Sequence, residues 1–183
     1  MPFTAQKIEA LKHKDGTQRR LVIAYLSIGE AERYRYYWRP EWEMRDSRPA
    51  WLGPENPNWP GNYLVTYSDP QWQSIIFGSP AATSIMAAGF DGVFLDRVDA
   101  FQDEGRDSPE SRDAMVSYLV RLADHAHRKD PGFLIIMQNT EELIRFETLR
   151  DLVRQRARQV ERIKELARRE GFRLYLPSGC LTG

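Results

Sequence analysis

Acidic and amide side chains follow three of the predicted strands, at the points where those strands end. They lie in residues 27–32 (SIGEAE), 96–99 (DRVD) and 138–142 (QNTEE). In parallel α/β folds the reactive groups gather just beyond the carboxyl ends of the strands, so we expect these side chains to share one rim. Acidic residues also stabilise helix N-termini, and this explanation stays open for Glu32 and Glu142 in particular. Three acidic strand ends together favour a functional site.

Paired carboxylates of this kind suit cleavage of a glycosidic bond. One acid protonates the leaving oxygen, while the other carboxylate acts as a nucleophile or activates water. Asp96 is the strongest single candidate, because it follows the apolar run GVFL directly and should point into the mouth of the sheet. The adjacent Arg97 is either a ligand for a phosphate or carboxylate group, or an ion-pair partner of Asp96 or Asp99.

Residues 34–77 form a second informative region, rich in aromatic side chains and proline. They hold eleven of the 21 aromatic residues, all five tryptophans and six of the eleven prolines. Within them, residues 51–62 (WLGPENPNWPGN) are predicted to form no regular helix or strand. A rigid aromatic loop offers a platform on which sugar rings stack, and side chains such as Asn56 can bind hydroxyl groups. The alternative is that the rings pack the loop onto the fold. We expect Trp72 in the core, and Trp51 or Trp59 exposed to ligand.

Strands and helices alternate along the chain. Apolar runs and turn signals predict strands at residues 21–28, 63–67, 92–95, 133–137 and 173–176, the first of them covered on both faces. Capping and periodicity predict helices at residues 4–12, 70–88, 109–128 and 147–170, with Ile8 and Leu11 on one side of the first. This order is typical of an α/β fold with a parallel sheet. Five strands favour an open sheet, because a closed eight-stranded barrel usually needs about 250 residues.

Composition narrows the function classes. The 26 basic residues balance the 26 acidic ones, so we expect no nucleic-acid partner. The basic residues of 145–169 are interspersed with acidic ones, which is typical of a solvated helix face. No window is apolar enough for a membrane span, and the polar, helical pattern of the first 20 residues leads us to expect no signal peptide there. The single cysteine, Cys180, excludes a disulfide framework. His125 and His127 would not face each other on a helix, so we expect no metal site there. No cofactor is expected.

The motifs at several of these positions resemble the endo-α-1,4-polygalactosaminidase-type glycoside hydrolases and their uncharacterised relatives. The resemblance runs from about residue 3 to residue 142, and its motifs are residues 24–32 (AYLSIGEAE), 36–38 (YYW), 54–57 (PENP), 89–99 (GFDGVFLDRVD) and 138–142 (QNTEE). It implies a fold derived from a (β/α)8 TIM barrel rather than an open sheet. It also implies a hydrolase that acts on α-linked galactosamine polymers or a similar polysaccharide, without a metal cofactor. Members of the family are usually exported, so the localisation stays undecided.

The resemblance and the strand ends together define the candidate site. The catalytic candidates are Asp96, with Glu141 or Glu142 as the acid. The substrate-binding candidates are Tyr25, Ser27, Glu30, Trp38, Trp51, Asn56, Trp59, Arg97, Asp99 and Asn139. The separation of the two carboxyl groups distinguishes retention from inversion of configuration, and only folding sets it.

Departures from the family pattern leave an alternative open. Residues 1–183 are expected to form a single domain, an incomplete barrel with about five parallel strands. It would lack the family's first strand and two or three βα units after about residue 142, including one that bears a further glutamate. Unpaired sheet edges would favour a homo-oligomer. The alternative function is a truncated carbohydrate-binding homologue without turnover. A nucleotide-binding α/β module is a weaker third hypothesis, because the chain has no glycine-rich phosphate loop.

Overall fold

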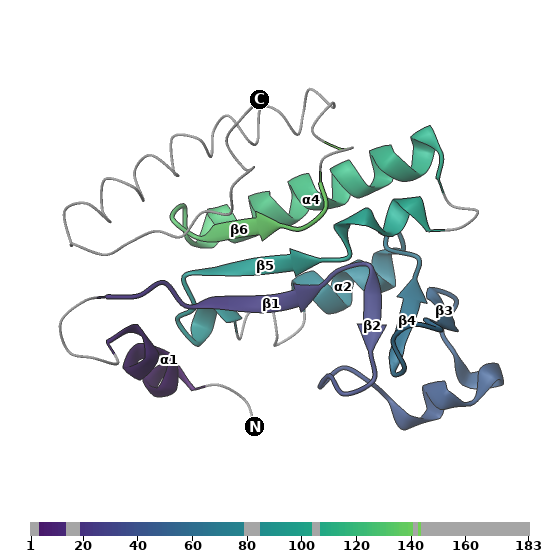
Figure 1. The fold of residues 1–183 in the computed structure, drawn as a ribbon, viewed down its shortest axis with the longest axis horizontal. Helices are drawn as coiled ribbons and strands as arrows, with labels where there is room; N and C mark the ends of the chain where they lie inside the picture. The colour runs from purple at the N-terminus through teal and green to yellow at the C-terminus, as the bar shows by residue number, and fades with distance from the viewer. Residues whose placement is uncertain (1–3, 14–18, 79–84, 104–106, 141–142, 144–183) are drawn as a thin grey trace.

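The computed structural model describes residues 4–13, 19–78, 85–103, 107–140 and 143, and contains a parallel and an antiparallel sheet (Figure 1). The parallel sheet has the order β1-β5-β6 and consists of β1 (Ile23–Ser27), β5 (Gly92–Asp96) and β6 (Leu134–Met137). The antiparallel sheet has the order β2-β4-β3 and consists of β2 (Glu30–Glu32), β4 (Asn62–Val65) and β3 (Leu52–Glu55). The α-helices are α1 (Ala5–Lys12), α2 (Pro70–Gly78) and α4 (Pro109–Lys129), and the 3-10 helices are η1 (Pro40–Glu43), η2 (Arg45–Ser47) and η3 (Val98–Gln102).

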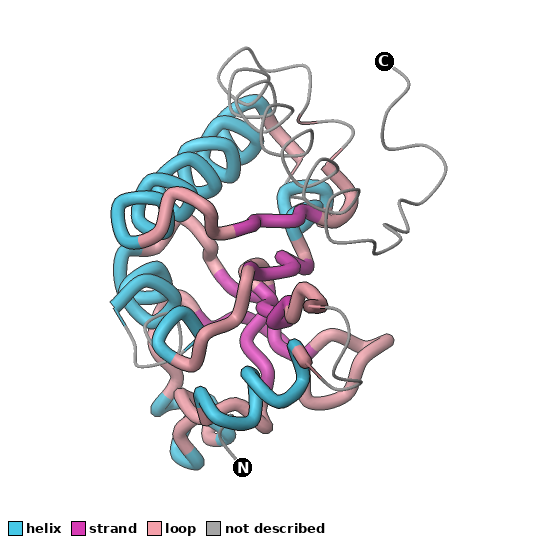
Figure 2. Tube along the Cα trace, turned by 90° about the vertical axis from the view of Figure 1, so that its left-hand side faces the viewer, coloured by secondary structure: helices cyan, strands magenta, loops and turns pink. Residues whose placement is uncertain are grey.

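The two faces of the parallel sheet differ in burial. Leu26 pairs with Leu95, and both side chains are buried. Helices α2 and α4 lie on this side of the parallel sheet (Figure 2). On the other face, Tyr25 pairs with Phe94, which pairs with Ile136, and both Tyr25 and Ile136 are exposed. The prediction that residues 21–28 are covered on both faces is therefore wrong at Tyr25, and this side chain is free to reach toward the end of the sheet.

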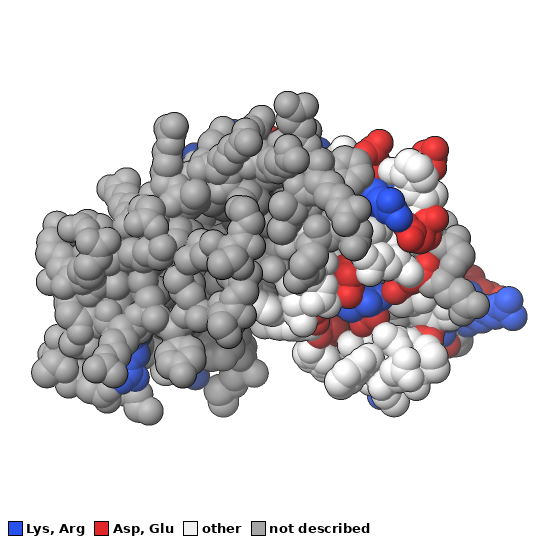
Figure 3. Space-filling view, turned by 45° about the horizontal axis from the view of Figure 1, so that its top comes forward, with Lys and Arg blue, Asp and Glu red and all other residues white. Residues whose placement is uncertain are grey.

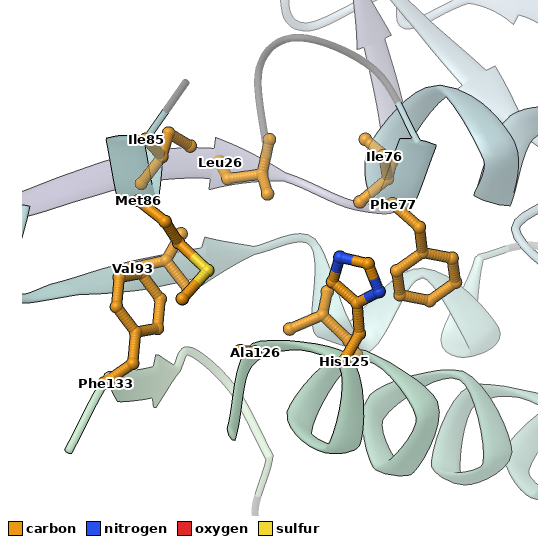
Figure 4. Close-up of a pocket in the computed structure, with 10 residues that line it drawn as sticks. Leu26, Ile76, Phe77, Ile85, Met86, Val93, His125, Ala126 and Phe133 are labelled. Carbon is orange, nitrogen blue, oxygen red and sulfur yellow. The ribbon is translucent and has the colours of Figure 1, made fainter. Parts of the chain in front are cut away.

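The covered face of the sheet packs against α2 and α4 in the hydrophobic core. Figure 4 shows side chains from the sheet, α2 and α4 converging on a small cavity, in which the rings of Phe77 and His125 lie 5.8 Å apart. The cavity has a volume of about 30 Å³ and an almost wholly apolar lining. A space of this size holds a water molecule or two and no sugar ring. It is a packing gap of the core.

Local signals at the helix ends are confirmed. Ser108 caps α4, since its side chain accepts a hydrogen bond from the Ser111 amide, and Pro109 occupies the first turn. Thr4 caps α1 in the same way. In α1, Ile8 is buried whereas Leu11 is exposed, so only one of these two apolar side chains is covered by the rest of the described structure. The structure gives α2 the bounds 70–78, and residues 79–84 of the predicted longer helix lie outside the described residues.

The segment between β1 and α2 contains an antiparallel sheet that was not predicted. The predicted strand at residues 63–67 forms β4, but it pairs antiparallel with β2 and β3 instead of joining the parallel sheet. Residues 51–62 were expected to hold no strand, yet they contain β3. Pro54 is tolerated there because β3 lies at the edge of its sheet. Gly61 has a φ of 88° in the connection to β4, a left-handed conformation that suits glycine.

The described residues thus confirm an α/β fold with a parallel sheet. Of the five predicted strands, three form the parallel sheet and the strand at residues 63–67 pairs antiparallel instead. The fifth, at residues 173–176, and the predicted helix 147–170 lie outside the described residues. An incomplete barrel stays a prediction. In the described part of the chain, every helix is too short or too polar to cross a membrane.

Candidate active site

The loops after β1 and β5 approach each other closely at Gly29. Ser27 pairs with Asp96 in the sheet, and the Ile28 amide donates to the Asp96 carbonyl at 3.1 Å. A Cβ atom at Gly29 would lie 2.5 Å from the Cβ of Ala100 and closer still to the backbone carbonyl oxygen of Arg97. Only glycine fits this approach, and it brings the residue after it, Glu30, against the loop that follows β5.

Arg97 is the centre of an ion-pair network. Its Nε lies 2.9 Å from Glu30 Oε1, its Nη2 lies 2.6 Å from Asp103 Oδ1, and its Nη1 lies 3.4 Å from Asp99 Oδ1. Burial by itself would lower the pKa of Arg97, but the hydrogen bond to Asp103 and the charges of Glu30, Asp103 and Asp99 raise this pKa above its ordinary value. Of the two predicted roles for Arg97, the geometry shows the ion-pair partner. Its partners are these three carboxylates and not Asp96.

Glu30 connects this network to the β3–β4 hairpin. Its side chain is only 2% exposed. Asn56 Nδ2 donates to Glu30 Oε1 at 2.8 Å, and Asn62 Nδ2 donates to Oε2 at 3.3 Å. Both oxygens of the buried carboxylate therefore have partners, as a buried charge requires. Glu30 and Asn56, two predicted site residues, are brought together in a structural role.

Asp96 is held by two uncharged donors. The Arg97 amide donates to its Oδ1 at 2.8 Å, and the Tyr25 hydroxyl donates to its Oδ2 at 2.6 Å. Within the described residues no cation pairs with this carboxylate. Burial, followed by the hydrogen bond to Asp96, raises the pKa of Tyr25 far above its ordinary value, so the hydroxyl keeps its proton. Asp96 is thus oriented without being neutralised by a positive charge.

The end of β6 joins the site through Asn139. Its φ of 54° is left-handed, and its Nδ2 donates to Asp99 Oδ2 at 2.9 Å. Asp99 therefore links the end of β6 to Arg97. Glu141 and Glu142, the two candidates for the acid, lie outside the described residues.

The β3–β4 hairpin presents Trp59 in a rigid turn. The Trp59 amide donates to the Asn56 carbonyl at 3.1 Å, and the Asn62 amide donates to the Trp59 carbonyl at 3.0 Å. The Gly61 amide donates to Glu55 Oε1 at 2.6 Å. The Trp59 side chain is 67% exposed, which matches the expectation that it is open to a ligand.

The other tryptophans pack against one another. Trp51, which was offered as a ligand-exposed residue, is buried, with its ring centroid 5.1 Å from those of Trp42 and Trp72. That assignment is wrong, because the strand β3 that follows Trp51 folds this side chain inward. Trp38 is half-buried against Trp42 and Tyr63, and Trp72 is buried as predicted. Most of the aromatic region is therefore core.

Two members of the network, Asp103 and Asn62, were not among the predicted site residues. Asp103 could have been suspected, because Asp96, Asp99 and Asp103 crowd around a lone arginine in the run DRVDAFQD. Asn62 gave no local signal, since its contact with Glu30 depends on the pairing of β2 with β4. Ser27 is buried, and its Oγ has no hydrogen-bond partner among the described residues.

The whole cluster carries a negative charge. Four carboxylates, those of Glu30, Asp96, Asp99 and Asp103, accompany the single guanidinium of Arg97. On the right of Figure 3, acidic side chains gather around fewer basic ones. Within the described ranges, no group of three or more His, Cys, Asp or Glu side chains is arranged to hold a metal ion. A cavity of about 390 Å³ lies between α2 and α4, and none of its lining residues belongs to the candidate site.

Two curated relatives are similar in sequence. The chain is 43% identical over 144 residues to an uncharacterised protein of Deinococcus radiodurans, with 79% of this chain and 44% of that protein covered. It is 40% identical over 149 residues to an uncharacterised protein of Methanocaldococcus jannaschii, with 79% and 41% covered. The chain therefore spans less than half the length of these relatives.

Two solved structures share the fold. Ega3 of Aspergillus fumigatus, in complex with galactosamine, matches with a TM-score of 0.59 and 24% identity, over 77% of this chain and 50% of that chain. The glycoside hydrolase domain of PelA from Pseudomonas aeruginosa matches with a TM-score of 0.56 and 22% identity, over the same shares. The family model of glycoside-hydrolase family GH114 matches residues 2–157, which confirms the family resemblance of the motifs. A parallel sheet with carboxylates at its strand ends agrees with that match, and the chain belongs to glycoside hydrolase family GH114.

Proposed function

We propose that this chain cleaves an α-linked galactosamine-type polysaccharide by carboxylate acid/base catalysis. The observation that carries the proposal is the setting of Asp96 at the carboxyl end of β5. Its two oxygens accept hydrogen bonds from Tyr25 and from a backbone amide, while Arg97 is occupied by other carboxylates. A carboxylate that uncharged donors orient, with no cationic partner among the described residues, suits the nucleophile or the base of a glycoside hydrolase.

The reaction then follows one of two courses. In a retaining reaction, Asp96 attacks the anomeric carbon and the bond to the leaving oxygen breaks, while Glu141 or Glu142 gives that oxygen a proton. In a second step, water attacks the anomeric carbon, gives a proton to the same glutamate, and breaks the bond between the sugar and Asp96. In an inverting reaction, Asp96 takes a proton from the water that attacks the anomeric carbon, and the same acid protonates the leaving oxygen. Tyr25 orients Asp96 in both courses, because its protonated hydroxyl stays a donor.

The charge of the site supports an amino-sugar substrate. Four carboxylates around one guanidinium attract protonated amino groups along a polysaccharide. Ega3, which shares the fold, was solved with galactosamine. Trp59 adds an exposed aromatic ring in a hairpin that Glu30 ties to the strand ends, and sugar rings can stack on such a ring.

The test is the release of reducing ends from α-1,4-linked polygalactosamine by the purified chain. D96N is the test variant, and D107N is the matched control, because Asp107 pairs with Arg112 outside the network. Turnover that is lost in D96N and kept in D107N supports the proposal. Turnover that survives in D96N overturns the role of Asp96. A chain that melts cooperatively and binds the polymer without turnover would instead be the carbohydrate-binding homologue.

A further inference from the structure

We propose that Tyr34 and Arg35, which Tyr25 connects to Asp96, form an outer sugar-binding subsite that binds a ring of the polysaccharide away from the cleaved bond. The subsite rests on the proposed function, since it requires a polysaccharide at Asp96. Neither residue belongs to the ion-pair network around Arg97, and the strand-end pattern of the sequence did not single them out.

The subsite is built on a buried carboxylate. Glu32, at the end of β2, is 2% exposed and accepts hydrogen bonds from Arg35 Nε, at 2.5 Å, and from the Tyr34 hydroxyl. The Glu32 amide donates to the Tyr37 hydroxyl at 3.0 Å. Burial alone would lower the pKa of Arg35, but the hydrogen bond and the charge of Glu32 raise it. The guanidinium is therefore permanently charged and fixed in orientation.

Arg35 lies between two tyrosine rings. Its Cζ is 5.4 Å from the ring centroid of Tyr25 and 5.2 Å from that of Tyr34. Both distances fall in the range of cation–π contacts. Since the Tyr25 hydroxyl also binds Asp96, three consecutive contacts connect Tyr34 to the candidate catalytic carboxylate. The two rings thus lie on a continuous path that leads outward from Asp96.

Tyr34 remains open to solvent although its hydroxyl and its neighbour are fixed. Its side chain is 71% exposed. An aromatic ring that is already held in place loses little conformational entropy when a ligand packs on it. A ring that served only to cover the Glu32–Arg35 ion pair would be expected to bury more of its own surface. The exposed ring, which Arg35 and Tyr25 connect to Asp96, offers a surface for the apolar face of a pyranose.

The test measures the binding of α-1,4-linked polygalactosamine to the full chain in a D96N background, where turnover does not interfere. We expect Y34A to weaken binding about three- to tenfold, the effect of losing one favourable ring contact. Y34F keeps the ring and loses only the bond to Glu32, so its affinity should stay within about twofold of the parent. Y36A is the matched control, because Tyr36 is also exposed and its ring packs edge-on against Tyr37.

If Y34A fails to fold, Y34W tests the contribution of the ring to polymer binding. Its larger ring lacks the hydroxyl, so Y34W should bind the polymer at least as tightly as Y34F. Equal affinity of Y34A and the parent would overturn the subsite and leave the proposed function intact. A loss in Y34F as large as that in Y34A would also overturn it, because the hydroxyl and not the ring would then matter. A D96N chain that binds no polymer would overturn the proposed function and the subsite together.

Discussion

Replacing Arg97 by alanine removes the cation that Glu30, Asp99 and Asp103 share. Glu30 is 2% exposed, and the Arg97 side chain is 22% exposed. Breaking a buried ion pair by removing one partner costs about 3–5 kcal/mol, because the other charge stays buried and unpaired. Since Arg97 keeps about a fifth of its surface in water, we expect the lower end, about 3 kcal/mol. In a chain of this length such a loss lowers Tm by roughly 6–12 °C.

The assay is urea unfolding followed by tryptophan fluorescence, which the buried Trp42, Trp51 and Trp72 report. R112A is the matched control, because Arg112 forms a more exposed pair with Asp107, and such pairs are worth about 1 kcal/mol or less. A loss below about 1 kcal/mol would refute the reasoning.

Three other perturbations test other parts of the structure. G29A should cost about 1–3 kcal/mol in urea unfolding, since the added Cβ collides with the loop of Arg97; an unchanged midpoint would contradict the close approach. In an absorbance titration, Tyr25 should form no tyrosinate near pH 10, so wild type minus Y25F should be flat there. Its raised pKa favours folding below the unfolded value, and this contribution is lost as the pH rises above it. W51A should lower the free energy of unfolding by about 3–5 kcal/mol. W59A should change it by no more than about 0.5 kcal/mol and should weaken polymer binding. Equal losses of stability in the two variants would show that the burial of Trp51 or Trp59 is misassigned.

Sequence reasoning succeeded where the signal was local. The cap at Ser108 and the apolar runs of β1, β5 and β6 were predicted, because capping and hydrophobic patterns act within a few residues. The secondary structure of the segment between β1 and α2 was predicted poorly. Proline and glycine indicated an irregular loop at residues 51–62. No local sequence signal shows that residues in this segment pair with β4 as an edge strand.

The sequence by itself determined the family, the α/β class and the position of Asp96 at the end of a strand, since each of these depends on motifs or on neighbours along the chain. Only the tertiary structure decided the partners of the charged side chains. Arg97 binds Glu30 and not the adjacent Asp96, because the close approach at Gly29 brings the loop after β1 against the loop after β5. Tyr25 reaches Asp96 because the parallel register places both on the same face of the sheet. Such contacts depend on strand pairing between distant segments, which no local pattern encodes.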